Sequence, residues 1–134
     1  MIKVQSTNRN LLDLFRGLES VKTIKGARFA VLVGKNLKEL KHMLSPIEEA
    51  ASPSIAFQEV SIQMRDLMEA EDADGVKILE EESKELIEER KAQMAAVEDM
   101  LDLETSVELH TIREDQLPAE VTGEQIEKLL ELIV

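Results

Sequence analysis

The sequence predicts a mainly helical protein, a long helical hairpin or bundle with a small two-stranded β element. Most apolar residues recur at spacings of three and four, which is the period of an amphipathic helix. Only two short stretches, 2–5 and 105–112, alternate apolar with polar residues as half-buried strands do. The chain has 134 residues, 43% of them apolar, so we expect a single domain over 1–134.

The first strand is expected over residues 2–5, where two apolar side chains alternate with polar ones. Two isolated strands are marginal in water, so this strand should pair with the one at 105–112 and close the chain on itself. Lys3 is then expected opposite an acidic residue such as Glu108.

Two helices are expected next, at about residues 8–19 and 25–44. Ser6, Thr7 and Asn8 can each cap a helix N-terminus, and leucines recur at helical spacing after them. The second helix has an apolar stripe close to heptad spacing. Its opposite side is basic and carries Arg28, Lys35, Lys38 and Lys41.

A third helix is expected at about 53–70. Serine followed by proline is a helix-start signal, so the pairs at 45–46 and 52–53 predict a kink or turn before this helix. Its apolar residues are expected to form a core stripe: Phe57, Val60, Met64, Leu67 and Met68.

The acidic segment 71–75 has turn chemistry and should end the third helix, with Gly75 at positive φ. A fourth helix is expected at about 78–101 and is the most acidic element. Its outer face carries Glu81, Glu85, Glu88 and Glu89. Across the second, third and fourth helices, six residues sit at core spacing: Leu37, Leu40, Leu67, Leu86, Met94 and Val97.

The C-terminal part returns to a strand over 105–112 and ends in a helix over 122–133. Thr122 and Gln125 form a capping box, which marks the start of that helix, and Pro118 ends the extended linker before it. The predicted element order is therefore β-α-α-α-α-β-α.

The charge is distributed unevenly along the chain. The net charge is −12, but residues 1–45 carry +6 and residues 46–134 carry −18. The acidic part repels a polyanion, and a chain with three Phe, no Trp and no Tyr has few side chains for stacking on bases. We therefore expect no nucleic-acid partner.

The residues that usually carry chemistry are sparse. No cysteine is present, which excludes disulfides and thiolate metal sites, and the two histidines lie far apart in the sequence. Asp72, Asp74, Gly75 and Glu81 match four positions of a calcium-binding loop, but Ala70 stands where the first ligand is required. We expect no catalytic residue, no cofactor and no metal, and a protein that is not an enzyme.

The longest uninterrupted apolar run is Phe29 to Val33, far short of the roughly 20 residues of a membrane span. The first residues lack the apolar region of a secretory signal. We expect no membrane association and a cytoplasmic location.

Several short segments carry a resemblance to known proteins. They are the start of the second helix, Ile24-Lys-Gly-Ala-Arg-Phe-Ala30, with Asn36; the turn Asp72-Ala-Asp-Gly75; Glu98, Leu101 and Glu104 before Val107-Glu-Leu109; and Leu117-Pro118. In these segments the chain is similar to a group of small bacteriophage-encoded proteins of unknown function. The resemblance implies a phage or prophage origin, in the host cytoplasm or associated with the virion, and no known catalysis.

Two functions are compatible with these observations. The first is a phage accessory or assembly protein that acts by binding protein, with self-association expected from aliphatic stripes that a monomer does not fully cover. The alternative is an acidic inhibitor that mimics a polyanion and binds a basic groove of a host protein. In both, the charged faces of the second and fourth helices are the candidate interaction surfaces, and we expect Lys35, Lys38 and Lys41 to approach the glutamates at 81–89.

Overall fold

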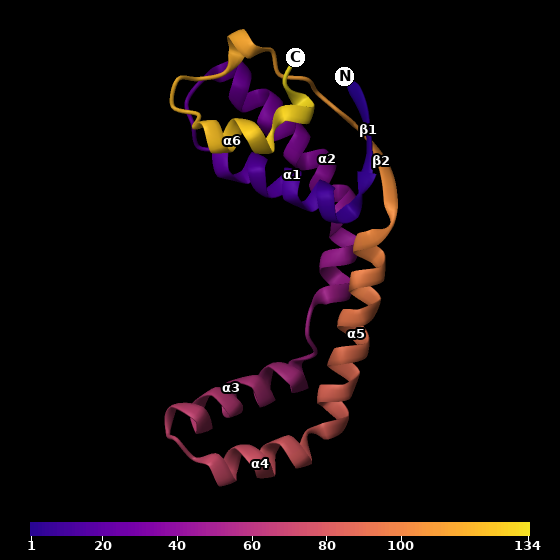
Figure 1. Cartoon of the computed structure of the whole chain (residues 1–134), viewed down its shortest axis with the longest axis vertical. Helices are drawn as coiled ribbons and strands as arrows, with labels where there is room; N and C mark the ends of the chain where they lie inside the picture. The colour runs from indigo at the N-terminus through magenta and orange to yellow at the C-terminus, as the bar shows by residue number, and fades with distance from the viewer. The chain divides into compact units, whose positions relative to one another are not determined.

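The computed structural model describes all 134 residues, and its mainly helical class with one two-stranded antiparallel sheet is as predicted (Figure 1). The elements are β1 Ile2–Thr7, α1 Asn8–Val21, α2 Ala27–Ala51, α3 Ile55–Glu69, α4 Ala73–Glu82, α5 Lys84–Asp102, β2 Glu104–Leu109, α6 Gly123–Lys128, and two 3-10 helices, η1 Glu114–Gln116 and η2 Leu130–Leu132.

We expected one domain over 1–134, and the chain divides into two compact units. Unit 1 consists of Met1–Pro46 and Met100–Val134, and unit 2 consists of Ile47–Asp99. Unit 1 therefore holds both strands, α1, α6 and most of α2, whereas unit 2 holds α3, α4 and most of α5.

In unit 1, β1 and β2 pair antiparallel, as the alternation of apolar residues predicts. The pairing places Lys3 opposite Glu108 and Val4 opposite Val107. Val4 and Val107 are both buried, so the sheet has one face toward the core. The predicted register is therefore confirmed.

The core of unit 1 is aliphatic and closed. Helices α1, α2 and α6 lie together beside the sheet (Figure 1). The C-terminus completes this packing, because Ile112 pairs with Ile133 in a parallel bridge, where the Ile112 N–H donates to the Leu132 carbonyl at 2.7 Å. The apolar residues with no exposed surface are Leu18, Leu40, Leu109, Ile112, Leu129 and Leu132.

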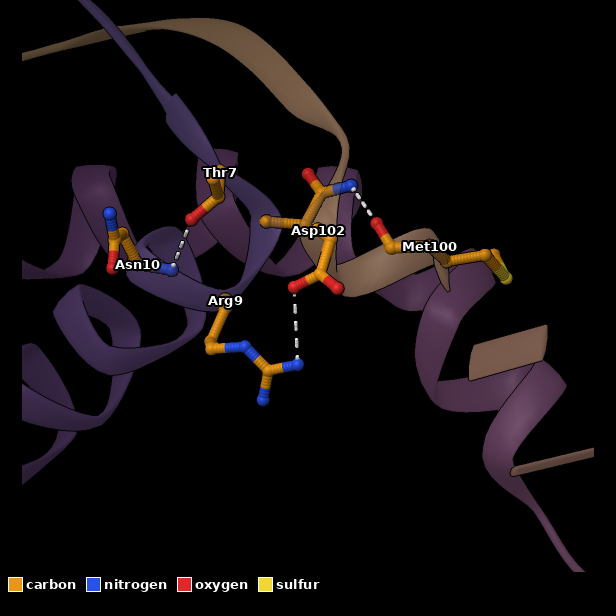
Figure 2. Close-up of polar contacts among 6 residues, drawn as sticks. Thr7, Arg9, Asn10, Met100 and Asp102 are labelled. Atoms are coloured by element: carbon orange, nitrogen blue, oxygen red, sulfur yellow. Dashed lines mark hydrogen bonds and ion pairs between the residues drawn. The ribbon is translucent and has the colours of Figure 1, made fainter. Parts of the chain in front are cut away.

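Polar contacts tie the start of α1 to the end of α5 and the start of β2 (Figure 2). The Thr7 hydroxyl caps α1 by accepting from the Asn10 N–H, one of the three caps that the sequence offers. The Asn8 amide donates to the Met100 carbonyl at 2.8 Å, and its oxygen accepts from the Thr105 hydroxyl.

A buried asparagine joins α2 to the end of β2. Asn36 has no exposed surface, donates to the His110 carbonyl at 2.9 Å and accepts from the His110 N–H at 2.7 Å. The side-chain amide thereby pairs with the backbone just after β2 as a neighbouring strand would, and both of its polar atoms are satisfied.

No turn separates helices at residues 45–46, because α2 continues through Pro46 to Ala51. Proline inside a helix costs about 3 kcal/mol. Leu44 and Ile47 on either side are both buried, and burying each contributes about 1.5–3 kcal/mol, which offsets that cost. The second Ser-Pro pair does lie between helices, but α3 begins at Ile55 with Ser54 as its cap.

The prediction of a single helix over 78–101 is wrong. This part of the chain forms two helices, α4 and α5, which are separated at Ser83. Ser83 is buried and lies outside helical geometry, with φ −102° and ψ 11°. Its N–H still donates to the Leu79 carbonyl and its carbonyl accepts from the Ile87 N–H, so only one residue interrupts the ladder. Serine is a poor residue for a helix interior, which favours the interruption there.

The turn between α3 and α4 forms differently from the prediction. Gly75 lies inside α4, and Glu71 is the residue with positive φ, at 56°. The Glu71 N–H donates to Met68 and the Asp72 N–H donates to Leu67, the two hydrogen bonds of a Schellman C-cap. Asp72 then caps α4 by accepting from the Gly75 N–H at 2.9 Å.

The strand and the helix of the C-terminal part are both shorter than predicted. β2 ends at Leu109, and the helix expected over 122–133 is α6 followed by η2. The capping box is confirmed, since the Thr122 and Gln125 side chains bond each other's backbone N–H groups. The last residues leave the helix because they pair with the strand-like segment at Ile112.

The expected core is only partly correct. Leu40 and Val97 are buried, with 0% and 4% of their surface exposed. The other four residues at core spacing are half-buried: Leu37, Leu67, Leu86 and Met94. Helical spacing identifies a residue's face but not how completely a neighbouring element covers it.

Candidate protein-binding surface

Helices α3 and α4 of unit 2 form an antiparallel hairpin joined by the turn at 70–72 (Figure 1). Each helix is capped by its own side chain, Ser54 or Asp72. Neither helix contains a buried residue, although both are amphipathic. The hairpin therefore leaves its apolar side chains at the surface.

The apolar stripe expected as core on the third helix lines an open hollow of about 330 Å³ instead. The hollow lies between α3 and the start of α5. Its lining is mostly apolar and consists of Phe57, Val60, Ser61, Met64, Arg65, Met68 and Ile87. The core expectation fails here because α5 covers this side of α3 only in part, so that Phe57, Val60 and Met64 are half-buried and Met68 is exposed.

A second open hollow, of about 440 Å³, lies at the turn end of the hairpin and shares Met68 with the first. Its lining mixes apolar and charged residues: Leu67, Met68, Glu71, Asp72, Ala73, Val76, Lys77 and Glu80. We call the two hollows together the hairpin groove. The groove has an apolar floor and, at this end, three carboxylates with one lysine.

Further apolar side chains of the hairpin are open to solvent. Ile55 is 77% exposed, Ile62 52% and Ile78 60%. Single exposed isoleucines are ordinary on a protein surface, but here they accompany an apolar groove on the same two helices. Such a concentration is typical of a surface that binds another protein.

Two side chains of α5 hold the segment that leads into α3 by hydrogen bonds to its backbone. Arg90 Nη1 donates to the Ala51 carbonyl at 2.7 Å, and Gln93 Nε2 donates to the carbonyls of Ala50 and Ser52, each at 2.7 Å. The carbonyls of Ala50 and Ala51 belong to the end of α2, where a helix leaves its last acceptors unpaired, and Ser52 follows directly. The Arg90 guanidinium also lies 5.7 Å from the centre of the Phe57 ring.

The basic residues predicted on the second helix form an exposed stripe on α2. Arg28, Lys35 and Lys38 follow one another at helical spacing, and Lys41 continues them. On the opposite side of the helix, Phe29, Val33, Asn36 and Leu40 are buried in unit 1. We call the four exposed cations the basic stripe.

An apolar patch adjoins the basic stripe. Val31 lies between the first two cations and is 54% exposed. A shallow hollow of about 340 Å³ surrounds it and is lined by Ala27, Arg28, Val31, Leu32 and Gln116. The exposed face of α2 is therefore basic along its length and apolar near its N-terminus.

The four predicted glutamates do not lie on one helix. Glu81 belongs to α4, and Glu85, Glu88 and Glu89 belong to α5; all four are exposed. They are part of unit 2, whereas the basic stripe is part of unit 1. The approach of lysines to these glutamates within one chain stays a prediction.

No three His, Asp or Glu side chains come close enough together to hold a metal ion. The acidic turn that resembles a calcium loop is used in helix capping, since the Asp72 carboxylate accepts from the Gly75 N–H. His42 is exposed and His110 is half-buried.

Some important residues carried little or no sequence signal. A polar residue within the buried stripe of an amphipathic helix is unusual, so the place of Asn36 among Phe29, Val33 and Leu40 indicates a buried amide. No comparable signal marks Arg90 or Gln93, because both occur in a charged helix among many similar residues.

No protein-family model, no curated protein and no solved structure matches this chain. None of its helices combines the length and apolar composition that crossing a membrane requires.

Proposed function

We propose that this chain is a non-enzymatic accessory or assembly protein that works by binding protein, with the hairpin groove as its docking face. The observation that carries the proposal is the absence of any buried residue from α3 and α4, combined with apolar side chains along the groove. An apolar groove left in water is unfavourable, and covering it with another protein removes that cost.

The occupant we propose for the groove is a second copy of this chain. The groove is apolar with carboxylates at one end, so it favours a partner that offers apolar side chains beside cations. The face of α2 that carries the basic stripe has this composition.

The resemblance in short segments to small bacteriophage proteins supports a phage origin, and with it a place in the host cytoplasm or on the virion. A small protein that self-associates through exposed helices suits such an accessory or assembly role. The proposal involves no cofactor, nucleic acid or membrane.

The first test is the mass of the full chain in solution, measured by size-exclusion chromatography with light scattering at micromolar concentration. We expect a species larger than a monomer. Met68 lies in both halves of the groove and is 59% exposed. The variant Met68→Glu should therefore be a monomer. A clean wild-type monomer would contradict self-association.

A second candidate function is the acidic inhibitor that mimics a polyanion. It is favoured by the charge of unit 2, which has sixteen acidic and five basic residues. Such a mimic should capture a basic host protein at low salt, release it at high salt, and lose it to added duplex DNA. A captured protein that duplex DNA does not displace would argue against mimicry.

A further inference from the structure

The two units differ sharply in charge. Unit 2 has a net charge of −11, from sixteen acidic and five basic residues, and unit 1 has −1, from twelve acidic and eleven basic residues. Two hairpin grooves placed against each other would bring two such acidic surfaces together and repel. A symmetric contact of groove with groove is therefore unfavourable.

Unit 1 is nearly neutral, but its positive charge is concentrated on α2. Between Ala27 and Pro46 the only acidic residue is Glu39, against the four cations of the basic stripe. From Arg28 to Lys41 the stripe extends about 20 Å along the helix at the usual rise per residue. A helix face of this length is comparable to a helix of the hairpin.

The two surfaces match in polarity as well as in charge. The face of α2 has an apolar patch at Val31 and Leu32, flanked by Arg28 and followed by the lysines. The hairpin groove is lined mainly by apolar side chains, with Arg65 in its first hollow and three carboxylates against one lysine at its turn end. Each surface therefore offers apolar area flanked by charges, mainly negative at the groove and positive on the α2 face.

We infer that copies of this chain associate head to tail, with the α2 face of one copy seated in the hairpin groove of the next. The inference rests on the self-association proposed above and names the two surfaces that make the contact. Because the surfaces are different patches, the contact is heterologous, and a dimer joined by one such contact keeps one free groove and one free α2 face. Assembly then continues beyond two copies, into a ring or an open chain, unless two copies make both contacts reciprocally and close as a two-fold dimer.

Salt distinguishes this arrangement from a symmetric one. The average mass from sedimentation velocity should fall between about 0.05 M and about 0.5 M NaCl, because salt screens the attraction between the two surfaces. A contact between two acidic grooves predicts the reverse, a mass that rises as salt screens their repulsion. A rising mass would overturn the head-to-tail inference and leave self-association standing.

Mixing complementary variants gives the decisive test. Lys35→Glu with Lys38→Glu destroys the basic stripe and keeps the groove, whereas Met68→Glu damages the groove and keeps the stripe. Each variant alone should be monomeric. Mixed in equal amounts they should form a 1:1 dimer and nothing larger, because each copy contributes one working surface.

The control carries the same change in charge elsewhere: Arg16→Glu with Lys128→Glu, two exposed residues of α1 and α6. It should keep the wild-type mass, and circular dichroism should show that all variants are folded. If the Lys35/Lys38 variant assembles like wild type and Met68→Glu does not, the inference is wrong but the groove remains a docking face. If all variants and wild type are monomers at every salt concentration, both proposals are wrong.

Discussion

The two units differ in how completely they bury their apolar side chains. Unit 1 buries them, so that Leu18, Leu40 and Leu129 have no exposed surface. In unit 2 only Ile47, Ser83 and Val97 are buried, and α3 and α4 contribute none. Unit 1 therefore has a closed apolar core, whereas the hairpin of unit 2 leaves apolar surface open to solvent, and the proposed docking face rests on that difference.

The polar contacts repeat this contrast. Asn36 of unit 1 makes its two hydrogen bonds to a backbone 74 residues away, within a closed core. Arg90 and Gln93 of unit 2 tie the start of the hairpin to α5 and the end of α2, but leave its far end untied. Unit 1 is therefore held together throughout, and the hairpin is held mainly at its base.

The largest expected effect tests the closed core against the open groove. Leu40→Ala in unit 1 should lower the free energy of unfolding by about 2–5 kcal/mol, because it leaves a cavity in a packed core. Leu67→Ala in the half-buried groove should cost about 1 kcal/mol, because less surface is removed from water and solvent can fill the space. Urea denaturation followed by circular dichroism measures both, and equal losses would contradict the comparison.

The second effect concerns the buried amide. Asn36→Ala should cost about 1–3 kcal/mol, because it leaves the His110 N–H and carbonyl without partners in the core. Asn10→Ala is the matched control: Asn10 is exposed on α1, and its amide reaches only the Ser6 hydroxyl. Similar melting temperatures for the two variants would show that Asn36 does not help to hold unit 1 together.

The elements with strong local signals were predicted correctly. The capping box at Thr122 and Gln125, the cap at Thr7 and the pairing of Lys3 with Glu108 each depend on a few residues. Periodicity also identified the basic stripe, since a helix buries one face and exposes the other. The two caps need no knowledge of distant parts of the chain, and the strand pairing needs only the two short stretches that alternate apolar with polar residues.

The features that were missed depend on distant contacts. Passage through Pro46 follows from burial of its neighbours, and the break at Ser83 adds a helix boundary where the apolar pattern is uninterrupted. The hairpin groove was predicted as core because an apolar stripe has the same spacing whether another element covers it or not. Arg90 gave no signal, because its partners are backbone carbonyls near Ala51.

A third effect tests the base of the hairpin. Arg90→Met keeps the length and apolar stem of the side chain but removes the donor to Ala51 and the cation over Phe57. We expect a loss of about 1–2 kcal/mol, less than the sum of a charge-assisted hydrogen bond and a cation–π contact, because Arg90 is only half-buried and water can replace the lost donor. Lys91→Met, an exposed neighbour with the same change in charge, should change the melting temperature little. If both variants melt alike, α5 does not anchor the hairpin through Arg90.

The smallest effect has the opposite sign and lies at the tip of the hairpin. Glu71 occupies the left-handed position of the C-cap of α3, at φ 56°, where a side chain costs about 1–2 kcal/mol and glycine is favoured. Glu71→Gly should therefore raise the free energy of unfolding by up to about 1 kcal/mol, less than the full cost because glycine also gains freedom in the unfolded chain. Glu69→Gly makes the same chemical change two residues earlier, at the last residue of α3, and should lower stability by up to about 1 kcal/mol. Opposite signs from two identical replacements would locate the turn at Glu71, whereas a loss in both variants would mean that residue 71 is not the left-handed position.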